Sequence, residues 1–181
     1  MLQIEDLEIN DVKLIKTNRF LDDRGFFQQN YQYDEYSLLG IKNNFVQDNW
    51  SFSKKGVLRG LHYQVKFPQA KLVQVLSGSV FDVVVDLRTN SSTYGKWVGK
   101  TLSDKNGYQL FVPKGFAHGF LVLESNTTFI YKCDSNYKPE YEFGIRWDDP
   151  TINIKWPDID VDYIISKKDK ELPKFKEIKH F

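Results

Sequence analysis

The chain has 181 residues, of which 41% are apolar and 27% charged, a balance typical of a globular domain with a sizeable core. The formal net charge is only +1, and no basic run precedes the C-terminal tail, which argues against nucleic-acid binding. No signal peptide or apolar membrane span is recognised, and the lone Cys133 excludes an intrachain disulfide. These features predict one domain over residues 1–181, in a reducing cytoplasm and away from membranes.

Short segments rich in Val, Phe, Tyr and Leu recur along the chain. Strands are predicted, in chain order, at 26–31, 45–53, 57–64, 71–76, 80–87, 95–102, 108–112, 119–123 and 127–133. Turn residues separate them at Lys55-Gly56, Ser77-Gly78, Asn106-Gly107 and Ser125-Asn126. Aromatic residues make up 15% of the chain, which also favours β structure. This rhythm predicts an all-β sandwich or barrel.

Helical signals are confined to two places. Residues 34–39 are predicted to form a short helix that Gly40 closes. The Lys-rich tail after Asp158 is predicted to hold another, in which Ser166, followed three residues later by Asp169, caps a turn. Both helices would be short and peripheral to the sheets.

Strand alternation identifies polar side chains that share a face with apolar ones. Gln47 and Asn49 share one face of their strand, and Trp50 lies on the other. Lys71 is aligned with two valines, so it lies either at a strand end, with its stem reaching to water, or inside a polar pocket. Tyr131, between Phe and Cys on its face, either fills core or faces a cavity.

Two histidines lie among the predicted strands. Strict alternation would point Arg59 and His62 to opposite faces, but Gly60 between them permits a bulge that turns both toward one cavity. An imidazole among apolar residues near cations is a candidate base for removing a carbon-bound proton. His118 lies at 113–119, which is predicted to be a tight loop, where it is either functional or a turn residue.

Other chemistries lack their motifs. A metal site usually needs three or four ligands, and His62 and His118, with His180 in the terminal tail, are a poor set, so no metal is expected. The chain has no Gly-rich phosphate loop of the nucleotide-hydrolase type and no Gly-x-Ser-x-Gly elbow. Cys133, on an apolar strand, is expected to pack rather than act as a nucleophile.

Motifs spread over nearly the whole chain resemble one enzyme family and follow its order. They are residues 23–27, 45–49, 56–64, 71–73, 78–86, 111–120 and 145–150. In these segments the chain resembles the dTDP-4-dehydrorhamnose 3,5-epimerase family. The resemblance implies a cupin-type jelly-roll barrel, a homodimer, no cofactor, and a nucleotide-diphosphate 4-keto-6-deoxy sugar as substrate.

The resemblance also implies roles for four residues. Epimerisation next to a ketone requires a base on one face of the sugar and an acid on the other. His62 matches the base that takes the proton from C5 and then C3, and Asp169 matches the aspartate that pairs with it. Lys71 matches the lysine beside the C4 oxygen, where a cation stabilises the oxyanion. Tyr131 matches the acid that returns a proton from the opposite face.

Binding residues follow from the same resemblance. The positions that match residues near the nucleotide sugar and its diphosphate are Arg24, Gln47, Asn49, Arg59 and His118. Tyr137 matches an aromatic residue near the base, and Glu142 a carboxylate in the same region. In this family the strand that carries Arg24 reaches into the neighbouring subunit's site, so the resemblance implies that catalysis depends on the dimer.

Two departures from the family pattern leave alternatives open. Gln29, which the resemblance places among the substrate-binding residues, stands where the family usually has a glutamate, and Trp50 stands where it usually has a histidine. The same chemistry on a GDP-linked 4-keto heptose, or at a single carbon, therefore stays open. So do a ketoisomerase and, from another class, a non-catalytic barrel that binds sugar nucleotides. The combination of His62, Asp169, Lys71 and Tyr131 argues against a simple binding module.

Overall fold

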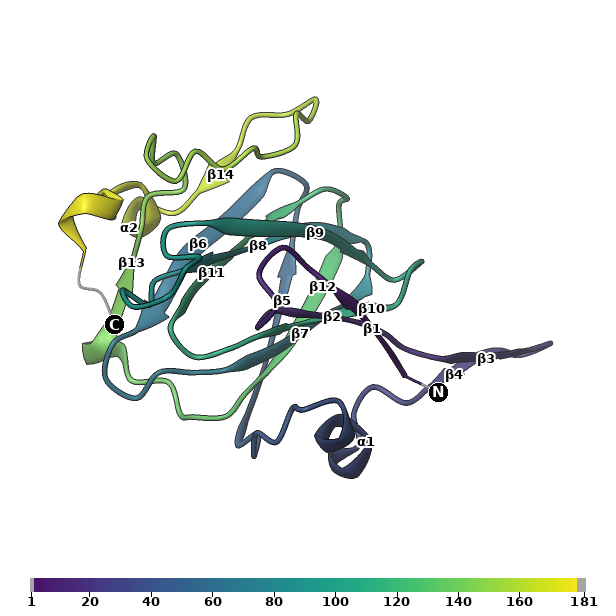
Figure 1. Cartoon of the computed structure of the whole chain (residues 1–181). Helices are drawn as coiled ribbons and strands as arrows, with labels where there is room; N and C mark the ends of the chain where they lie inside the picture. Colours follow the sequence, from purple (N-terminus) through teal and green to yellow (C-terminus); the bar gives the residue numbers. More distant parts are fainter. Residues whose placement is uncertain (1, 179–181) are drawn as a thin grey trace.

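The computed structural model describes residues 2–178. Two six-stranded β-sheets face each other in it (Figure 1). The first sheet has the order β1 (Gln3–Asp6), β2 (Lys13–Lys16), β10 (Tyr108–Val112), β7 (Lys71–Ser77), β12 (Thr127–Cys133) and β5 (Gln47–Ser53). The second has the order β13 (Glu142–Gly144), β6 (Val57–Gln64), β11 (Phe116–Val122), β8 (Ser79–Asp86) and β9 (Trp97–Ser103), with β14 (Ile164–Ile165) pairing parallel to β6. The two sheets form a jelly-roll barrel of the cupin type, as predicted.

The remaining elements lie outside the barrel. The hairpin of β3 (Arg19–Asp22) and β4 (Gly25–Gln28) projects away from it, beyond the first sheet (Figure 1). Helix α1 (Tyr33–Leu38) covers the outer face of that sheet, and α2 (Lys167–Lys170) lies beside β6 on the far side of the molecule. The described residues also form two 3₁₀ turns, η1 (Pro139–Tyr141) and η2 (Phe175–Glu177). None of the helices in residues 2–178 has the length and apolar character that a membrane crossing requires.

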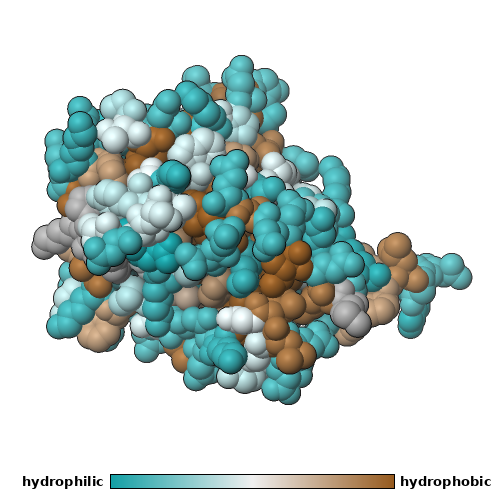
Figure 2. Space-filling model, viewed as in Figure 1, coloured by the Kyte–Doolittle hydropathy of each residue, from teal (hydrophilic) through white to brown (hydrophobic). Residues whose placement is uncertain are grey.

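Apolar side chains fill three layers. The largest cluster lies between the sheets and includes Val73, Val84, Leu110 and Phe129. A second covers the outer face of β6 and β8 under the segment that follows β13, and a third lies beneath α1. Removal of this much apolar surface from water is the main stabilising contribution to the barrel. Figure 2 shows further apolar side chains exposed beside α1 and the base of the hairpin, among them Phe20, Phe27 and Leu38.

Every strand predicted from the sequence is present, with ends shifted by a few residues, and both short helices lie where they were predicted. Strands β1, β2, β3, β13 and β14 were not predicted. The loop prediction for His118 is wrong, because this residue lies inside β11. All seven residues of β11 are buried between β6 and β8, and the turn that Pro113 and Gly115 indicate ends at Gly115. His180 lies outside the described residues.

Candidate active site

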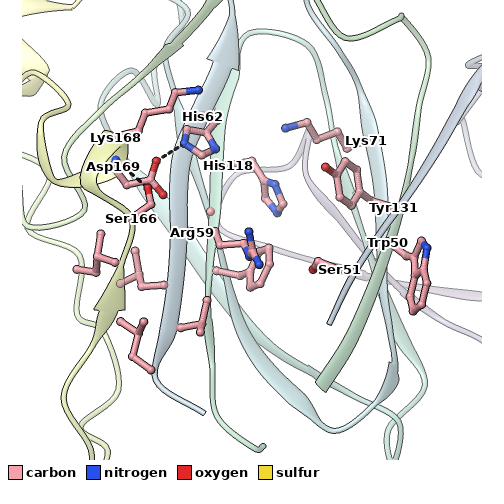
Figure 3. A pocket seen from close by; sticks show the side chains of 16 residues that line it. Trp50, Ser51, Arg59, His62, Lys71, His118, Tyr131, Ser166, Lys168 and Asp169 are labelled. Atoms are coloured by element: carbon pink, nitrogen blue, oxygen red, sulfur yellow. Dashed lines mark hydrogen bonds and ion pairs between the residues drawn. The ribbon is translucent and has the colours of Figure 1, made fainter. Parts of the chain in front are cut away.

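A cavity of about 520 Å³ opens at one end of the barrel (Figure 3). Its walls come from β5, β6, β7, β11 and β12 and from the tail around α2. A second cavity of about 310 Å³ adjoins it and shares three wall residues with it, His62, Lys71 and Tyr131. Together the two cavities form one cleft with a polar floor, large enough for an extended ligand.

The bulge that Gly60 permits is present in β6. His62 pairs with His118 of β11, whereas Arg59 pairs with Phe120, so β6 has one more residue than its partner between these pairs. Gly60 has φ +109°, and a Cβ there would lie 2.7 Å from the Cα of Gly119. The extra residue cancels strict alternation, and as a result Arg59 and His62 both line the cavity.

His62 is held by a buried carboxylate from the tail. Its Nε2 lies 2.7 Å from Oδ1 of Asp169, whose Oδ2 accepts a hydrogen bond of 3.3 Å from the backbone N–H of Gly60. Ser166 caps α2 by accepting from the N–H of Asp169 at 3.0 Å, as its spacing predicted. Burial alone would raise the pKa of Asp169, but the bonds from His62 and Gly60 hold it below its usual value. The ionised carboxylate therefore fixes a proton on Nε2 and leaves Nδ1 as the basic atom.

Lys71 and Tyr131 lie across the cavity from His62 (Figure 3). They come from the neighbouring strands β7 and β12, and the Lys71 ammonium is 5.9 Å from the centroid of the Tyr131 ring. Burial lowers the pKa of Lys71 and raises that of Tyr131. The phenol thus keeps its proton until a strong base forms beside it, and the ammonium lacks the water that would otherwise screen its charge.

A second imidazole–carboxylate pair lies deeper in the barrel, with its histidine on the cavity wall and its carboxylate buried behind it. His118 Nε2 is 2.9 Å from Oδ2 and 3.0 Å from Oδ1 of Asp82. Burial raises the pKa of Asp82, and the nearby His118 and Lys71 offset this only in part. Arg59 lies toward the cavity as well, with its guanidinium donating to Ser53 at 3.3 Å.

The adjoining cavity is lined by groups that recognise polar ligands. Gln47 donates to Asn49 at 3.0 Å and accepts from the backbone N–H of Tyr137 at 2.8 Å. The Tyr137 hydroxyl donates to Glu142 at 2.8 Å, and burial followed by this carboxylate raises the pKa of Tyr137 to about 12. Burial alone would raise the pKa of Glu142, but Lys168 and Tyr137 hold it below its usual value. Glu142 Oε1 lies 4.0 Å from Nδ1 of His62, so the two cavities meet at the imidazole.

Two residues predicted for the site lie away from it. Arg24 is at the tip of the exposed hairpin, where it forms an ion pair of 2.6 Å with Asp22. Gln29 follows the hairpin and donates to Glu35 of α1 at 3.0 Å. The other predicted site residues line the cleft: Gln47, Asn49, Arg59, His62, Lys71, His118, Tyr131, Tyr137, Glu142 and Asp169.

The sequence interpretation missed two charged residues, one that lines the cleft and one buried behind its wall. Lys168 lines the first cavity, forms an ion pair with Glu142 and precedes Asp169 on α2. Its position in the predicted capped turn was the available signal. Asp82 lies among the valines of β8, where a lone carboxylate in an apolar strand signals a buried partner. Within residues 2–178, no three His, Cys, Asp or Glu side chains gather closely enough to hold a metal ion.

The fold and this arrangement define a class of protein. A jelly-roll barrel holds a carboxylate-bound imidazole on one wall of an open cavity and a buried phenol with an ammonium on the other. Such opposed groups are suited to moving protons on and off a bound molecule. The site is therefore that of an acid–base enzyme.

Comparison with known proteins identifies the family. Residues 6–177 match the profile of dTDP-4-dehydrorhamnose 3,5-epimerase. The chain is 50% identical over 158 residues to the dTDP-4-dehydrorhamnose 3,5-epimerase of Methanothermobacter thermautotrophicus, covering 87% of this chain and 85% of that protein. Identity to the Escherichia coli K12 protein of the same description is 49% over 167 residues, or 91% of this chain and 90% of that one.

A solved structure agrees with the sequence comparison. The dTDP-6-deoxy-D-glucose-3,5-epimerase of Legionella pneumophila Philadelphia 1, in complex with dTDP-4-keto-L-rhamnose, has a TM-score of 0.96 to this chain at 47% identity. The match covers 99% of this chain and 95% of that one. The chain belongs to the dTDP-4-dehydrorhamnose 3,5-epimerase family and is an isomerase.

Proposed function

We propose that this protein converts dTDP-4-dehydro-6-deoxyglucose to dTDP-4-dehydrorhamnose by inverting C5 and C3 of the sugar. The observation that carries the proposal is the placement of His62, held by Asp169, across one cavity from Tyr131 and Lys71. Inversion of a carbon next to a ketone needs a base and an acid on opposite faces of the sugar, and this cavity supplies both.

Each inversion breaks one C–H bond and forms another. Nδ1 of His62 takes the proton from C5, and the electron pair moves to the C4 oxygen to give an enolate. The Lys71 ammonium stabilises this oxyanion, a kind of interaction worth about 2.7–4 kcal/mol where single oxyanion donors have been removed from other enzymes. The Tyr131 hydroxyl then gives its proton to C5 from the opposite face. His62 then releases its proton to solvent and the Tyr131 phenolate takes one from solvent, so both groups return to their starting states. The same steps follow at C3.

The rest of the cleft supports a nucleotide diphosphate as the part of the substrate that binds and stays attached to the sugar throughout the reaction. Arg59 offers the forked donors that suit phosphate oxygens, and Lys168 adds a second cation on the same cavity. Gln47, Asn49 and Tyr137 line the adjoining cavity, where amides and an aromatic ring suit a nucleobase. The bound dTDP sugar of the Legionella relative supports thymidine as this base.

The alternatives are not favoured. Neither departure changes the cleft floor that this chain builds, because Gln29 lies outside the cleft of its own chain and Trp50, at the rim, is 72% exposed. No feature of the cleft therefore supports a GDP-linked heptose as the substrate. A ketoisomerase or a simple binding barrel would have no use for a phenol opposite the imidazole.

We further propose a homodimer in which each hairpin reaches the neighbouring cleft. Arg24 and Gln29 lie outside their own cleft, and the hairpin exposes Phe20, Leu21 and Phe27, a group of apolar side chains of the kind found at protein interfaces. This arrangement predicts complementation: a mixture of His62→Ala and Arg24→Ala chains, each inactive alone, regains activity after refolding together. A mixture that stays inactive, although sedimentation shows mixed dimers, would contradict it.

Two organisational proposals accompany this function. Residues 1–181 form a single catalytic domain, in keeping with the apolar layer that the two sheets share. The protein works in the cytoplasm, in keeping with its one buried cysteine, Cys133.

Solvent exchange tests the reaction directly. The protein is incubated with dTDP-4-dehydro-6-deoxyglucose in deuterated water, and NMR follows the sugar. Deuterium at both C3 and C5, with inversion of both centres, is the expected result. Deuterium at one centre would replace the proposal with a single-centre epimerase, and a carbonyl moved to another carbon would replace it with a ketoisomerase. Tight binding of the nucleotide sugar with no deuterium incorporated would replace the proposal with a non-catalytic barrel that binds sugar nucleotides.

A further inference from the structure

The segment after β13 joins the two halves of the His62–Asp169 pair. β13 pairs with β6 so that Gly144 lies opposite His62. The next residue, Ile145, exchanges two backbone hydrogen bonds with Leu61, of 2.9 and 3.2 Å. The start of the segment is therefore fixed to the strand of the imidazole, one residue away from it.

The end of the same segment holds the tail that carries Asp169. The backbone N–H of Arg146 donates to the carbonyl of Pro173 at 3.0 Å. Asp149, only 3% exposed, accepts from the backbone N–H of Phe175 through Oδ2 at 2.9 Å. Its other oxygen, Oδ1, accepts from the N–H groups of Thr151 and Ile152 at 2.8 and 2.9 Å. One oxygen of Asp149 thus shapes its own loop, and the other anchors the tail.

Side-chain packing reinforces the anchor. The Phe175 ring is buried against Tyr94, with 5.3 Å between the ring centroids, and lies close to Gly95, where an added Cβ would be 3.3 Å from it. Leu172 fills the space beside Gly144, since a Cβ there would lie 2.6 Å from its methyl group. On the other side of Asp169 the chain pairs with β6 through β14, which is two residues long.

We infer that Asp149 is a positioning residue for the reaction: through the Phe175 N–H it fixes the tail and keeps the Asp169 carboxylate on Nε2 of His62. The kinetic part of this inference rests on the proposed function. The pair has a separation of 2.7 Å, and a shift of about 1 Å in the tail would take it beyond the range of a hydrogen bond. The motif that contains Asp149 has no contact with the cleft, so its effect on catalysis would be transmitted through the tail.

Asp149→Asn separates the two functions of this side chain. The amide oxygen still accepts from the N–H groups of Thr151 and Ile152. The amide nitrogen is a donor and lies against the Phe175 N–H, which is also a donor, so the hydrogen bond to the tail is lost. Asp148→Asn is the matched control, because the carboxylate of Asp148 pairs with Arg146 at the surface and is not part of the anchor. Asp169→Asn gives the result of direct loss of the carboxylate.

The test has a readout that needs no substrate. In the free protein, ¹⁵N-edited NMR detects the hydrogen-bonded Nε2–H of His62; this signal should persist in the wild type and Asp148→Asn and be lost or broadened in Asp149→Asn. With substrate, kcat of Asp149→Asn should fall about 10- to 100-fold, the range typical when a side chain that orients a catalytic group is removed, with KM little changed. Retention of the Nε2–H signal and of kcat would overturn the inference.

A second variant keeps the test decisive if Asp149→Asn does not fold. Phe175→Leu preserves the backbone N–H but removes the ring contacts with Tyr94 and Gly95, so it should weaken the same NMR signal to a smaller extent. An unchanged signal in this variant would contradict the anchor. Failure of the proposed function would instead appear as a wild type that holds the Nε2–H signal and yet does not exchange sugar protons.

Discussion

Both histidines that line the cleft are paired with a carboxylate, and the two pairs differ in the origin of that carboxylate. His118 and Asp82 come from the adjacent strands β11 and β8, and the His118 ring stacks on Phe129 with 6.3 Å between centroids. His62 comes from a strand, but Asp169 comes from the tail, 107 residues away in sequence. The side chain of His62 is 27% exposed and that of His118 is 7% exposed. The His118–Asp82 pair is part of the barrel's packing, and the His62–Asp169 pair is assembled at the mouth of the barrel, where the cavity opens.

This difference changes what each pair can do. Asp169 receives hydrogen bonds from Gly60 and His62 that hold its pKa below the usual value, whereas burial raises the pKa of Asp82. A carboxylate that stays ionised can support an imidazolium during turnover. His62 also leaves a basic nitrogen open to the cavity, while the ring of His118 is covered by aromatic side chains. Catalysis is therefore expected at the pair that the tail completes, and binding at the pair inside the sheet.

The largest effect is expected from His62→Ala. Removal of a general base typically costs 10²- to 10⁴-fold, and we expect a loss near 10⁴-fold because both carbons depend on the same imidazole. Deuterium incorporation at C3 and C5 measures it. His118→Ala is the comparison, and it should mainly raise KM while exchange continues at saturating substrate. If deuterium incorporation were lost in His118→Ala and kept in His62→Ala, the His118–Asp82 pair would be the catalytic one and the His62–Asp169 pair the binding one.

Tyr131→Phe should have the next largest effect, and of a different kind. The base and Lys71 remain, so the enolate still forms and C5 still exchanges its hydrogen with solvent. Return of a proton from the opposite face should fall about 10²- to 10³-fold, within the range for a positioned acid. NMR distinguishes the two outcomes, since exchange without inversion leaves the sugar in its original configuration. Equal losses of exchange and inversion would place Tyr131 in formation of the enolate.

Replacement of the carboxylates compares the pairs directly. Asp169→Asn should lower kcat by about 10- to 100-fold, because an amide does not stabilise the imidazolium. Asp82→Asn keeps an acceptor for His118 and should change kcat by less than that. Steady-state kinetics of both variants at saturating substrate measure the contrast. Equal effects on kcat would show that the two pairs contribute alike to catalysis, although only the His62–Asp169 pair lies at the mouth of the barrel.

The fold was largely predictable because most strands alternate clearly and end at turn residues. The four-residue strands β1 and β2 were missed, since they are too short to show a period of two. β1 is held by pairing with β2, and β2 by pairing with β10 far along the chain. His118 was assigned to a loop because Pro113 and Gly115 before it and Gly119 after it were taken to mark one continuous turn. Its burial between two neighbouring strands decides its structure instead.

The site was predictable in part. The sequence allowed a bulge at Gly60, and the convergence of Arg59 and His62 follows from it. The pairing of His62 with Asp169 came from family resemblance, since no local pattern connects residues so far apart. The roles of Asp82 and Asp149 depend on long-range contacts with β11 and with the tail, and strand periodicity does not report such contacts.

The smallest predicted effect is a difference of sign in how pH changes stability. The folded pKa of Asp169 lies below 3.8, so this residue contributes stability above about pH 4, which is lost as pH falls through its folded pKa. The folded pKa of Asp82 lies above 3.8, so this residue lowers stability above its folded pKa, and the folded state gains stability as pH falls through that value.

Two variants reveal these opposite signs. The destabilisation caused by Asp169→Asn, relative to the wild type, should shrink between pH 7 and about pH 3, because the wild type loses the same contribution. The destabilisation caused by Asp82→Asn should grow over the same interval, because only the wild type gains stability there. Urea unfolding at several pH values measures both differences. Parallel pH dependences would mean that the two carboxylates have similar environments, and the distinction between a pair at the mouth and a pair in the sheet would then rest on exposure alone.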